Sequence, residues 1–199
     1  MLPFPPRARR TARRTALAAL LPIALAAAHV APRPHDVDKA HSEISFVAES
    51  RLLSAHGFFG RWDAEVMLDP EMPERSTVGI RIDAASIDTR VKRRDDHLRS
   101  AEFFDVARHP HITFTSRSIR RVSSTQFDMT GDLTMRGITK SIVVPTTVVF
   151  YDGGLGRFKG AFAVNRRDYG VSYDSKLNPI ADTVQVQFNM SLRERKGAR

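Results

Sequence analysis

Three neighbouring side chains, Arg94, Asp95 and His97, form the group in this sequence best suited to acid–base chemistry. A guanidinium, a carboxylate and an imidazole within four residues could hold an anion and move a proton. The same spacing on a short helix more commonly gives capping and ion-pair contacts that fix a loop. We therefore favour a structural role for the cluster. If Arg94 and His97 are functional, we expect them to make polar contacts at the mouth of a binding site.

Two other histidines, His109 and His111, lie on either side of Pro110. At positions i and i+2 they could share a metal ion, but no Asp or Glu completes a recognisable ligand set, and the proline indicates a loop. The chain has no cysteine, which excludes thiol catalysis and thiolate metal sites. It also has no glycine-rich phosphate loop and no nucleophile elbow. We predict a protein that is not an enzyme and has no resident metal or cofactor.

From Asp36 onward, short stretches of alternating apolar and polar residues are separated by turn residues. This period of two is typical of strands with one buried face. About eight strands are predicted, at 44–48, 61–68, 78–82, 112–114, 127–135, 142–151, 158–164 and 183–192. Strands of this kind belong to antiparallel sheets, so we predict an all-β fold, an antiparallel barrel with an apolar interior. The charged segment 91–100 predicts one short helix between the third and fourth strands, and Pro145 indicates an edge, a bulge or the barrel rim.

The alternation places a set of aromatic side chains on the inward faces of these strands. They are Phe46, Phe59, Trp62, Phe114, Phe127, Phe162 and Phe188. For any one of them core packing is the simpler interpretation, but as a set we expect them to include several walls of a ligand cavity. Gly131 and Gly160 lie on the same faces, where a glycine marks either open space or a sharp bend. We count Gly160 among the candidate ligand-binding positions.

The pair Phe103 and Phe104 follows the predicted helix. These side chains could close one end of the barrel or anchor the helix to it, and we favour the anchor. If they have a role in binding, it lies at the mouth, beside Arg94 and His97.

The formal charge of +9 at first suggests a nucleic-acid or anionic-membrane partner. However, residues 1–28 contain five arginines and no acidic residue, and without them 26 basic residues face 22 acidic ones. That is an ordinary solvated surface, so we predict no nucleic-acid partner. The arginines precede the apolar stretch 16–28, which is too short to span a bilayer as a helix. We predict a signal peptide over 1–28, cleaved after Ala28, and a periplasmic or secreted protein.

After the signal peptide we expect a flexible segment at 29–35, one barrel domain over 36–193 and a basic tail at 194–199. Within the barrel domain, several linked motifs resemble the YceI-like family. They are SIDT at 86–89, RDDHLRS at 94–100, FFD at 103–105, GDLT at 131–134, GITK at 137–140 and RRDYG at 166–170. The resemblance covers roughly residues 37–192 and is specific because the motifs occur together in order. One departure lies at 49–52, where many members have a histidine that this chain lacks.

The resemblance implies an exported, lipocalin-like barrel that carries or sequesters a long-chain amphiphile such as a polyisoprenoid, an isoprenoid quinone or a fatty-acid-like lipid. Two other hypotheses remain. One is a stress-linked or redox-partner module that uses a bound quinone-like isoprenoid. The other is an enzyme that acts on an exported amphiphile through the Arg94–His97 cluster. Transient membrane contact and a homodimer are compatible with each of them.

Overall fold

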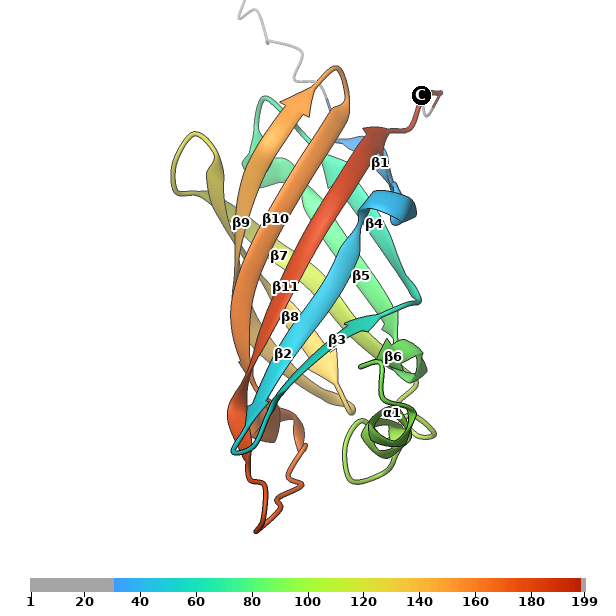
Figure 1. Cartoon of the computed structure of the whole chain (residues 1–199). Helices are drawn as coiled ribbons and strands as arrows, with labels where there is room; N and C mark the ends of the chain where they lie inside the picture. Colours follow the sequence, from blue (N-terminus) through green and yellow to red (C-terminus); the bar gives the residue numbers. More distant parts are fainter. Residues whose placement is uncertain (1–30, 198–199) are drawn as a thin grey trace, which may run out of the picture.

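The computed structural model describes residues 31–197, which form one antiparallel sheet rolled into a barrel (Figure 1). The strands are β1 Arg33–Val37, β2 Glu43–Ser50, β3 Ser54–Phe59, β4 Trp62–Leu68, β5 Thr77–Asp83, β6 Ile87–Asp88, β7 His111–Arg121, β8 Gln126–Met135, β9 Ile138–Asp152, β10 Leu155–Asn165 and β11 Ile180–Glu194. The helices are α1 Lys92–Arg99 and the short 3₁₀ turns η1 Lys39–His41, η2 Pro73–Arg75, η3 Ala84–Ser86 and η4 Arg166–Tyr169.

The sheet closes because β1 pairs with both β4 and β11. Its strands occupy eight barrel positions. The position beside β11 is shared by two short strands, β1 and β2. The next position is shared by β3 and β4. The two-residue β6 pairs with β3 and extends the sheet there. The remaining strands are paired in the order β4, β5, β7, β8, β9, β10 and β11. The predicted all-β antiparallel barrel and the single short α-helix after β5 are thereby confirmed.

The alternation in the sequence becomes the inside and outside of the barrel, because successive side chains of a strand point to opposite faces. Along β4, for example, Trp62 and Val66 are buried while Asp63 and Glu65 are exposed. Pro145 lies within β9, where it is paired only with β8, since the pairing of β9 with β10 ends at Thr146 opposite Gly160. The missing N–H of the proline therefore falls on an unpaired edge. This is where a strand tolerates proline, because proline cannot donate a hydrogen bond to a neighbouring strand.

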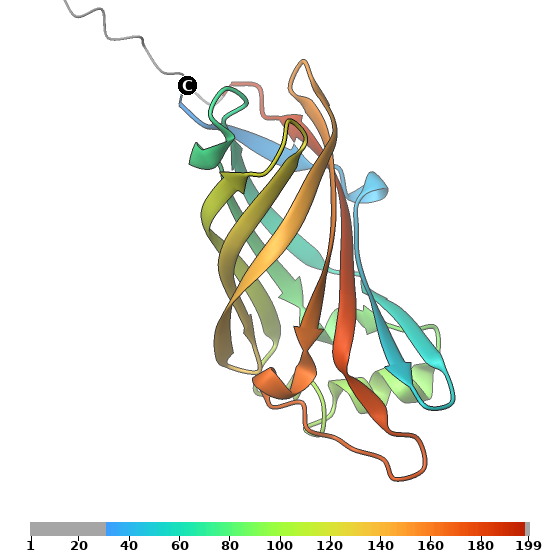
Figure 2. The same ribbon diagram turned by 90° about the vertical axis from the view of Figure 1, so that its left-hand side faces the viewer.

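The two ends of the barrel differ. The upper end in Figure 1 contains the turns β4–β5, β7–β8 and β9–β10 and the carboxyl end of β11. The lower end contains α1, the β2–β3 hairpin and the long connection from β10 through η4 to β11, which Figure 2 shows projecting below the strands. No helix among residues 31–197 is both long and apolar enough to cross a membrane.

Two predicted boundaries differ in the structure. Residues 33–35, which we expected to be flexible, belong to β1, where His35 is opposite Val66 on one side and Glu194 on the other. The segment is ordered because its backbone groups are paired on both sides. Glu194, assigned to the tail, is the last residue of β11. Residues 1–28, for which we predict a signal peptide, lie outside the described residues.

Candidate ligand-binding cavity

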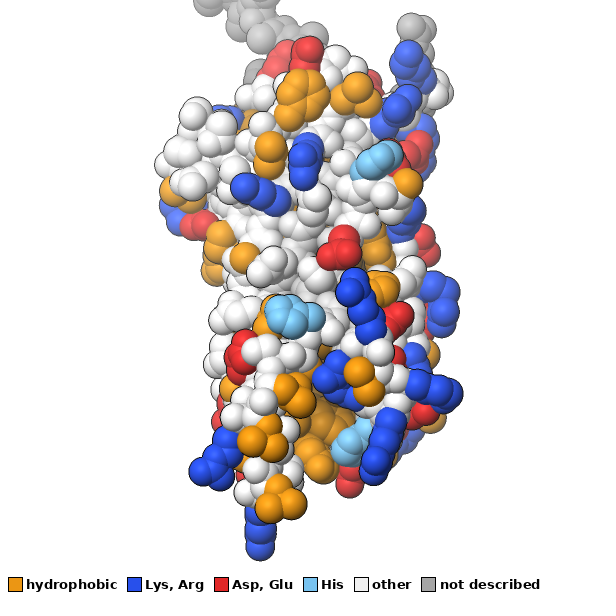
Figure 3. Space-filling view, in the orientation of Figure 1, with side chains coloured by type: hydrophobic (Ala, Val, Ile, Leu, Met, Phe, Trp, Pro, Cys, Tyr) orange, Lys and Arg blue, Asp and Glu red, His pale blue; other side chains and the backbone are white. Residues whose placement is uncertain are grey.

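A cavity of about 1400 Å³ extends along the barrel axis. Side chains from both ends line it, from Leu68 and Tyr151 at the upper end to Leu53, Leu98 and Tyr173 at the lower end. Pockets for small ligands commonly have 300–1,000 Å³, so this one suits a larger or longer molecule. At the lower end, Figure 3 shows a hollow of hydrophobic surface between the lowest loop and the region over α1. We call this opening the mouth.

The structure places most of the predicted aromatic residues in the cavity wall. Those that line it are Phe46, Phe59, Phe114, Phe127, Phe162 and Phe188. They come from β2, β3, β7, β8, β10 and β11, so six of the eight barrel positions contribute a ring. Such a wall offers a large apolar contact area, and aromatic side chains supply most of it per residue.

Trp62, in contrast, is buried without being part of the cavity wall. It packs in the core cluster that includes Ile82 and Phe59. The Lys39 ammonium lies 3.6 Å from the centre of its ring and also donates a hydrogen bond to the Trp62 carbonyl oxygen. This cation–π contact and the surrounding core account for Trp62. Of the seven predicted aromatic residues, Trp62 is the one that packs in the core outside the cavity wall.

Gly160 does not mark open space either. A Cβ at this position would overlap the carbonyl oxygen of Pro145 and the ring of Phe188. Two other strand glycines show the same arrangement with a ring from a neighbouring strand. The pairs are Gly57 with Phe46, Gly131 with Phe114 and Gly160 with Phe188. Each glycine lets a phenyl ring lie close to the backbone of the barrel wall, the arrangement known as aromatic rescue. At Gly131 and Gly160 the space above the glycine is therefore taken by a phenyl ring.

The acid–base cluster is tied into a loop. Asp95 is buried and its Oδ1 accepts hydrogen bonds from the Thr89 backbone N–H at 2.8 Å and from Thr89 Oγ1 at 2.5 Å. The Arg94 guanidinium donates to Thr89 Oγ1 at 2.7 Å and to the Thr89 carbonyl at 2.9 Å. Both side chains therefore hold the turn that leads into α1 in place. Arg94 still lines the cavity beside the mouth.

His97 belongs to an aromatic cluster at the mouth. Its Nε2 lies 2.5 Å from Glu102 Oε2, and its ring centre is 4.9 Å from those of Phe103 and Tyr173. Phe103 and Tyr173 are also 4.9 Å apart, so α1, the turn after it and the β10–β11 connection meet here. Phe104 packs edge-to-face against Phe59 on the cavity wall. Phe103 and Phe104 thus anchor the helix segment and also line the cavity.

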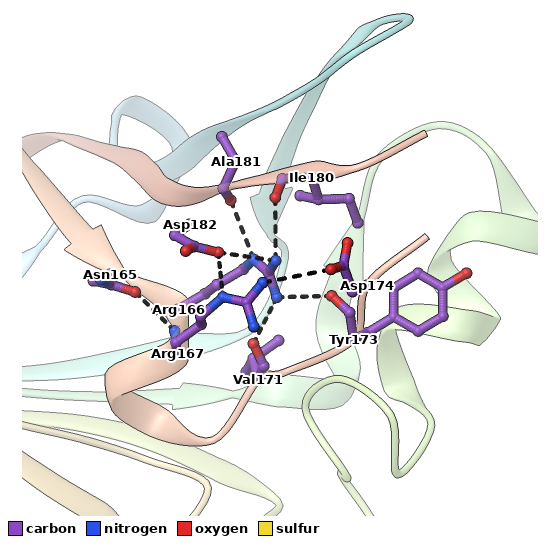
Figure 4. Close-up of polar contacts among 9 residues, drawn as sticks. All are labelled: Asn165, Arg166, Arg167, Val171, Tyr173, Asp174, Ile180, Ala181 and Asp182. Atoms are coloured by element: carbon purple, nitrogen blue, oxygen red, sulfur yellow. Dashed lines mark hydrogen bonds and ion pairs between the residues drawn. The ribbon is translucent and has the colours of Figure 1, made fainter. Parts of the chain in front are cut away.

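Arg166, to which the sequence assigned no role, organises the lower end (Figure 4). Its buried guanidinium donates four hydrogen bonds of 2.7–3.1 Å to backbone carbonyl oxygens. The acceptors are Val171, Tyr173, Ile180 and Ala181. Nη2 also lies 3.1 Å from Asp182 Oδ1. Burial and the charge of Arg167 lower the pKa of Arg166, but a guanidinium remains charged in proteins.

These bonds fix both ends of the connection between η4 and β11, including Tyr173 at the mouth. The sequence offers one signal for Arg166, the RRDYG motif at 166–170, but the carbonyl groups that Arg166 binds lie outside that motif.

The upper end of the barrel contains buried polar side chains. His35 is buried, with Nε2 3.1 Å from the Tyr151 hydroxyl, and Tyr151 lines the cavity. Burial, and secondarily the charge of Glu194, raises the pKa of Tyr151. The buried Asp69 accepts hydrogen bonds from the backbone N–H groups of Glu71 and Met72 and so shapes the β4–β5 turn. The first contact joins β1 to β9, and the others fix the β4–β5 turn at this end of the barrel.

Within residues 31–197, no group of three or more His, Asp or Glu side chains is placed to hold a metal ion. The arrangement is that of a lipocalin-like protein, a closed antiparallel barrel around one large apolar cavity. A family model described as the YceI-like domain matches residues 35–192. The chain belongs to the YceI-like family.

Relatives and solved structures agree with this assignment. A UPF0312 protein of Ectopseudomonas mendocina is 31% identical over 87% of this chain and 94% of the relative. The crystal structure of Burkholderia cenocepacia BcnA has a TM-score of 0.74 and 29% identity, covering 78% of this chain and 99% of that one. A polyisoprenoid binding domain from Saccharophagus degradans has a TM-score of 0.65 at 15% identity, covering 82% and 99%, which shows a shared fold.

Proposed function

We propose that this protein binds and carries a long-chain amphiphile of the polyisoprenoid, isoprenoid-quinone or fatty-acid type. The observation that carries the proposal is the cavity of about 1400 Å³ with its wall of phenyl rings. Removing an apolar chain from water contributes roughly 0.8 kcal/mol for each CH₂ group, before the cost of ordering the chain. The polyisoprenoid binding domain with the same fold supports this class of ligand.

The proposal needs no catalytic step. Arg94 and Asp95 are hydrogen-bonded to Thr89, and His97 is hydrogen-bonded to Glu102. These contacts favour a binding role over the enzyme alternative. We therefore expect His97→Ala to leave amphiphile binding nearly unchanged. Turnover of an amphiphile by the wild-type protein but not by His97→Ala would support the enzyme instead.

A cavity-filling pair of variants tests the carrier. Ala64 lines the cavity, whereas Ala163 is exposed on the outside of β10. Ala64→Leu should lower the amount of isoprenoid retained by the delipidated protein, and Ala163→Leu should not. Mass spectrometry of organic extracts and titration with a long-chain isoprenoid measure this. Equal binding by both variants, or no lipid retained by the wild type, would refute the carrier.

We also propose that the carrier acts outside the cytoplasm. The support is the order of charge and hydrophobicity in residues 1–28, with the small residues Ala26, Ala27 and Ala28 at its end. Sequencing of the exported protein should begin near His29. Recovery of protein with an intact Met1 from the soluble cytosol would contradict export.

A further inference from the structure

Large apolar side chains are exposed around the mouth of the cavity. Leu52 and Leu53 lie in the β2–β3 turn, Leu177 in the connection between η4 and β11, and Val91 directly before α1. Leu177 is 85% exposed and Leu52 is 73% exposed. Single exposed apolar residues are common, but a group from three separate segments around one opening indicates an interaction surface. We call these three segments, residues 51–53, 90–93 and 175–178, the rim.

The rim segments are held next to one another. The backbone N–H of Leu52 donates to Asn178 Oδ1 at 3.0 Å, and that of Arg51 donates to the Pro179 carbonyl at 3.1 Å. The α1 side is joined to them through the contact between the rings of His97 and Tyr173. Leu53 and Val91 themselves line the cavity. Apolar surface therefore continues from the cavity to the rim, and Figure 3 shows hydrophobic surface in the hollow at this end.

The rim is also strongly basic. Its three segments contain five basic residues and no acidic one, namely Arg51, Arg90, Lys92, Arg93 and Lys176. Among residues 31–197, only Lys92 of these five forms an ion pair, with Asp96 at 2.6 Å. The neighbouring carboxylate of Asp174 is paired with Arg167. The rim therefore presents unneutralised cations between exposed apolar side chains.

We propose that the rim docks end-on against an anionic lipid surface. Leucines that enter the boundary of the acyl chains and cations that face the head groups form the pattern of an interfacial membrane contact. A second copy of this chain fits less well as the partner, because two rims in contact would bring five cations of each copy together, and these repel one another. Docked in this way, the mouth opens directly onto the bilayer, so an apolar chain enters or leaves without crossing water. The docking surface stands independently of the identity of the cargo.

Vesicle flotation tests the docking surface without measuring cargo. The chain from His29 onward serves, since it contains every strand of the closed barrel and lacks the apolar stretch 16–28. It should float with vesicles of phosphatidylcholine and phosphatidylglycerol, and much less with phosphatidylcholine alone or in high salt. Leu52→Ser with Leu53→Ser and Leu177→Ser should lower the bound fraction about ten-fold, and so should the set Arg51→Gln, Arg93→Gln and Lys176→Gln.

Matched controls come from the opposite end of the barrel. Val122→Ser with Leu155→Ser removes exposed apolar side chains there, and Arg193→Gln with Lys196→Gln removes exposed cations. Both controls should float like the wild type. Equal flotation with neutral vesicles, rim variants that bind normally, or controls that lose as much binding would each overturn the proposal. Concentration-dependent dimers that only the leucine variant abolishes, without flotation of the wild type, would make a second copy the partner instead.

Discussion

The phenyl ring of Phe188 occupies the space into which a side chain on Gly160 would have to project. The two residues are directly opposite in the pairing of β10 with β11, so the ring lies across the glycine. A Cβ at position 160 would also overlap the carbonyl oxygen of Pro145. Any larger residue at position 160 must therefore displace an interior ring or part the strands.

Gly160→Ala is expected to destabilise the protein by about 1–3 kcal/mol, the usual cost of overpacking a close contact. Gly79→Ala in β5 is the matched control, because a Cβ there would meet Glu65 only at ordinary contact distance, 3.9 Å. Denaturant unfolding compares the two variants. An equal and small effect at both positions would show that the ring over Gly160 yields freely.

Trp62 is expected to be a poor reporter of cavity occupancy. Because it is held by Lys39 and the core cluster, its fluorescence should change little when an isoprenoid is added. Trp62→Ala should instead cost about 3–5 kcal/mol of stability, as for other large buried aromatics. A tryptophan placed in the wall by Phe162→Trp, in a Trp62→Phe background, should respond to the same ligand. A response from Trp62 alone would contradict this assignment.

Arg166→Lys is expected to loosen the lower end more than the barrel. An ammonium cannot reach the four carbonyl groups that the guanidinium binds, and the loss should be on the order of 3 kcal/mol. Amide exchange should rise most over residues 171–180. Arg167→Lys, on an exposed side chain that pairs with Asp182, serves as the control and should leave exchange there close to that of the wild type.

Stability should fall in acid partly through Asp83. The hydrogen bonds from Arg61 hold the pKa of Asp83 below its ordinary value, which is the value expected in the unfolded chain. The ionised carboxylate therefore stabilises the fold above that ordinary value, about 3.9, and the contribution is lost as the pH falls through the lower folded pKa. Asp83→Asn should be less stable than the wild type at neutral pH, with the difference shrinking in acid.

Unfolding curves at several pH values measure the effect of Asp83→Asn. Asp63→Asn is the comparison, because Asp63 is 94% exposed and makes only a surface ion pair with Lys39. A pH-independent gap between Asp83→Asn and the wild type would contradict the linkage.

The sequence predicts the barrel well because the patterns that define it lie within single strands and one short segment. Alternation along β4 or β11 already separates inside from outside, and the charged segment before Ser100 already indicates a helix. The features that the sequence did not predict depend on contacts between residues far apart in the chain. Nothing in RPHDV at 33–37 alternates, and it becomes a strand because β4 and, from the other end of the chain, β11 supply hydrogen bonds. Alternation correctly places Trp62 on the inward face of its strand. Its contact with Lys39, however, is set by the tertiary structure and cannot be predicted from the local sequence.

Closure of β1 against β11 also constrains how the protein acquires its shape. The hydrogen bonds that join Arg33 to Glu194 link residues 161 positions apart. A chain still emerging from a ribosome or a translocation channel lacks its last strand, so it cannot seal the sheet. Pairings of such long sequence separation slow folding, because the intervening chain must be ordered first. The cavity therefore comes into existence only once the whole polypeptide is available, so a ligand can be enclosed only after β11 has paired.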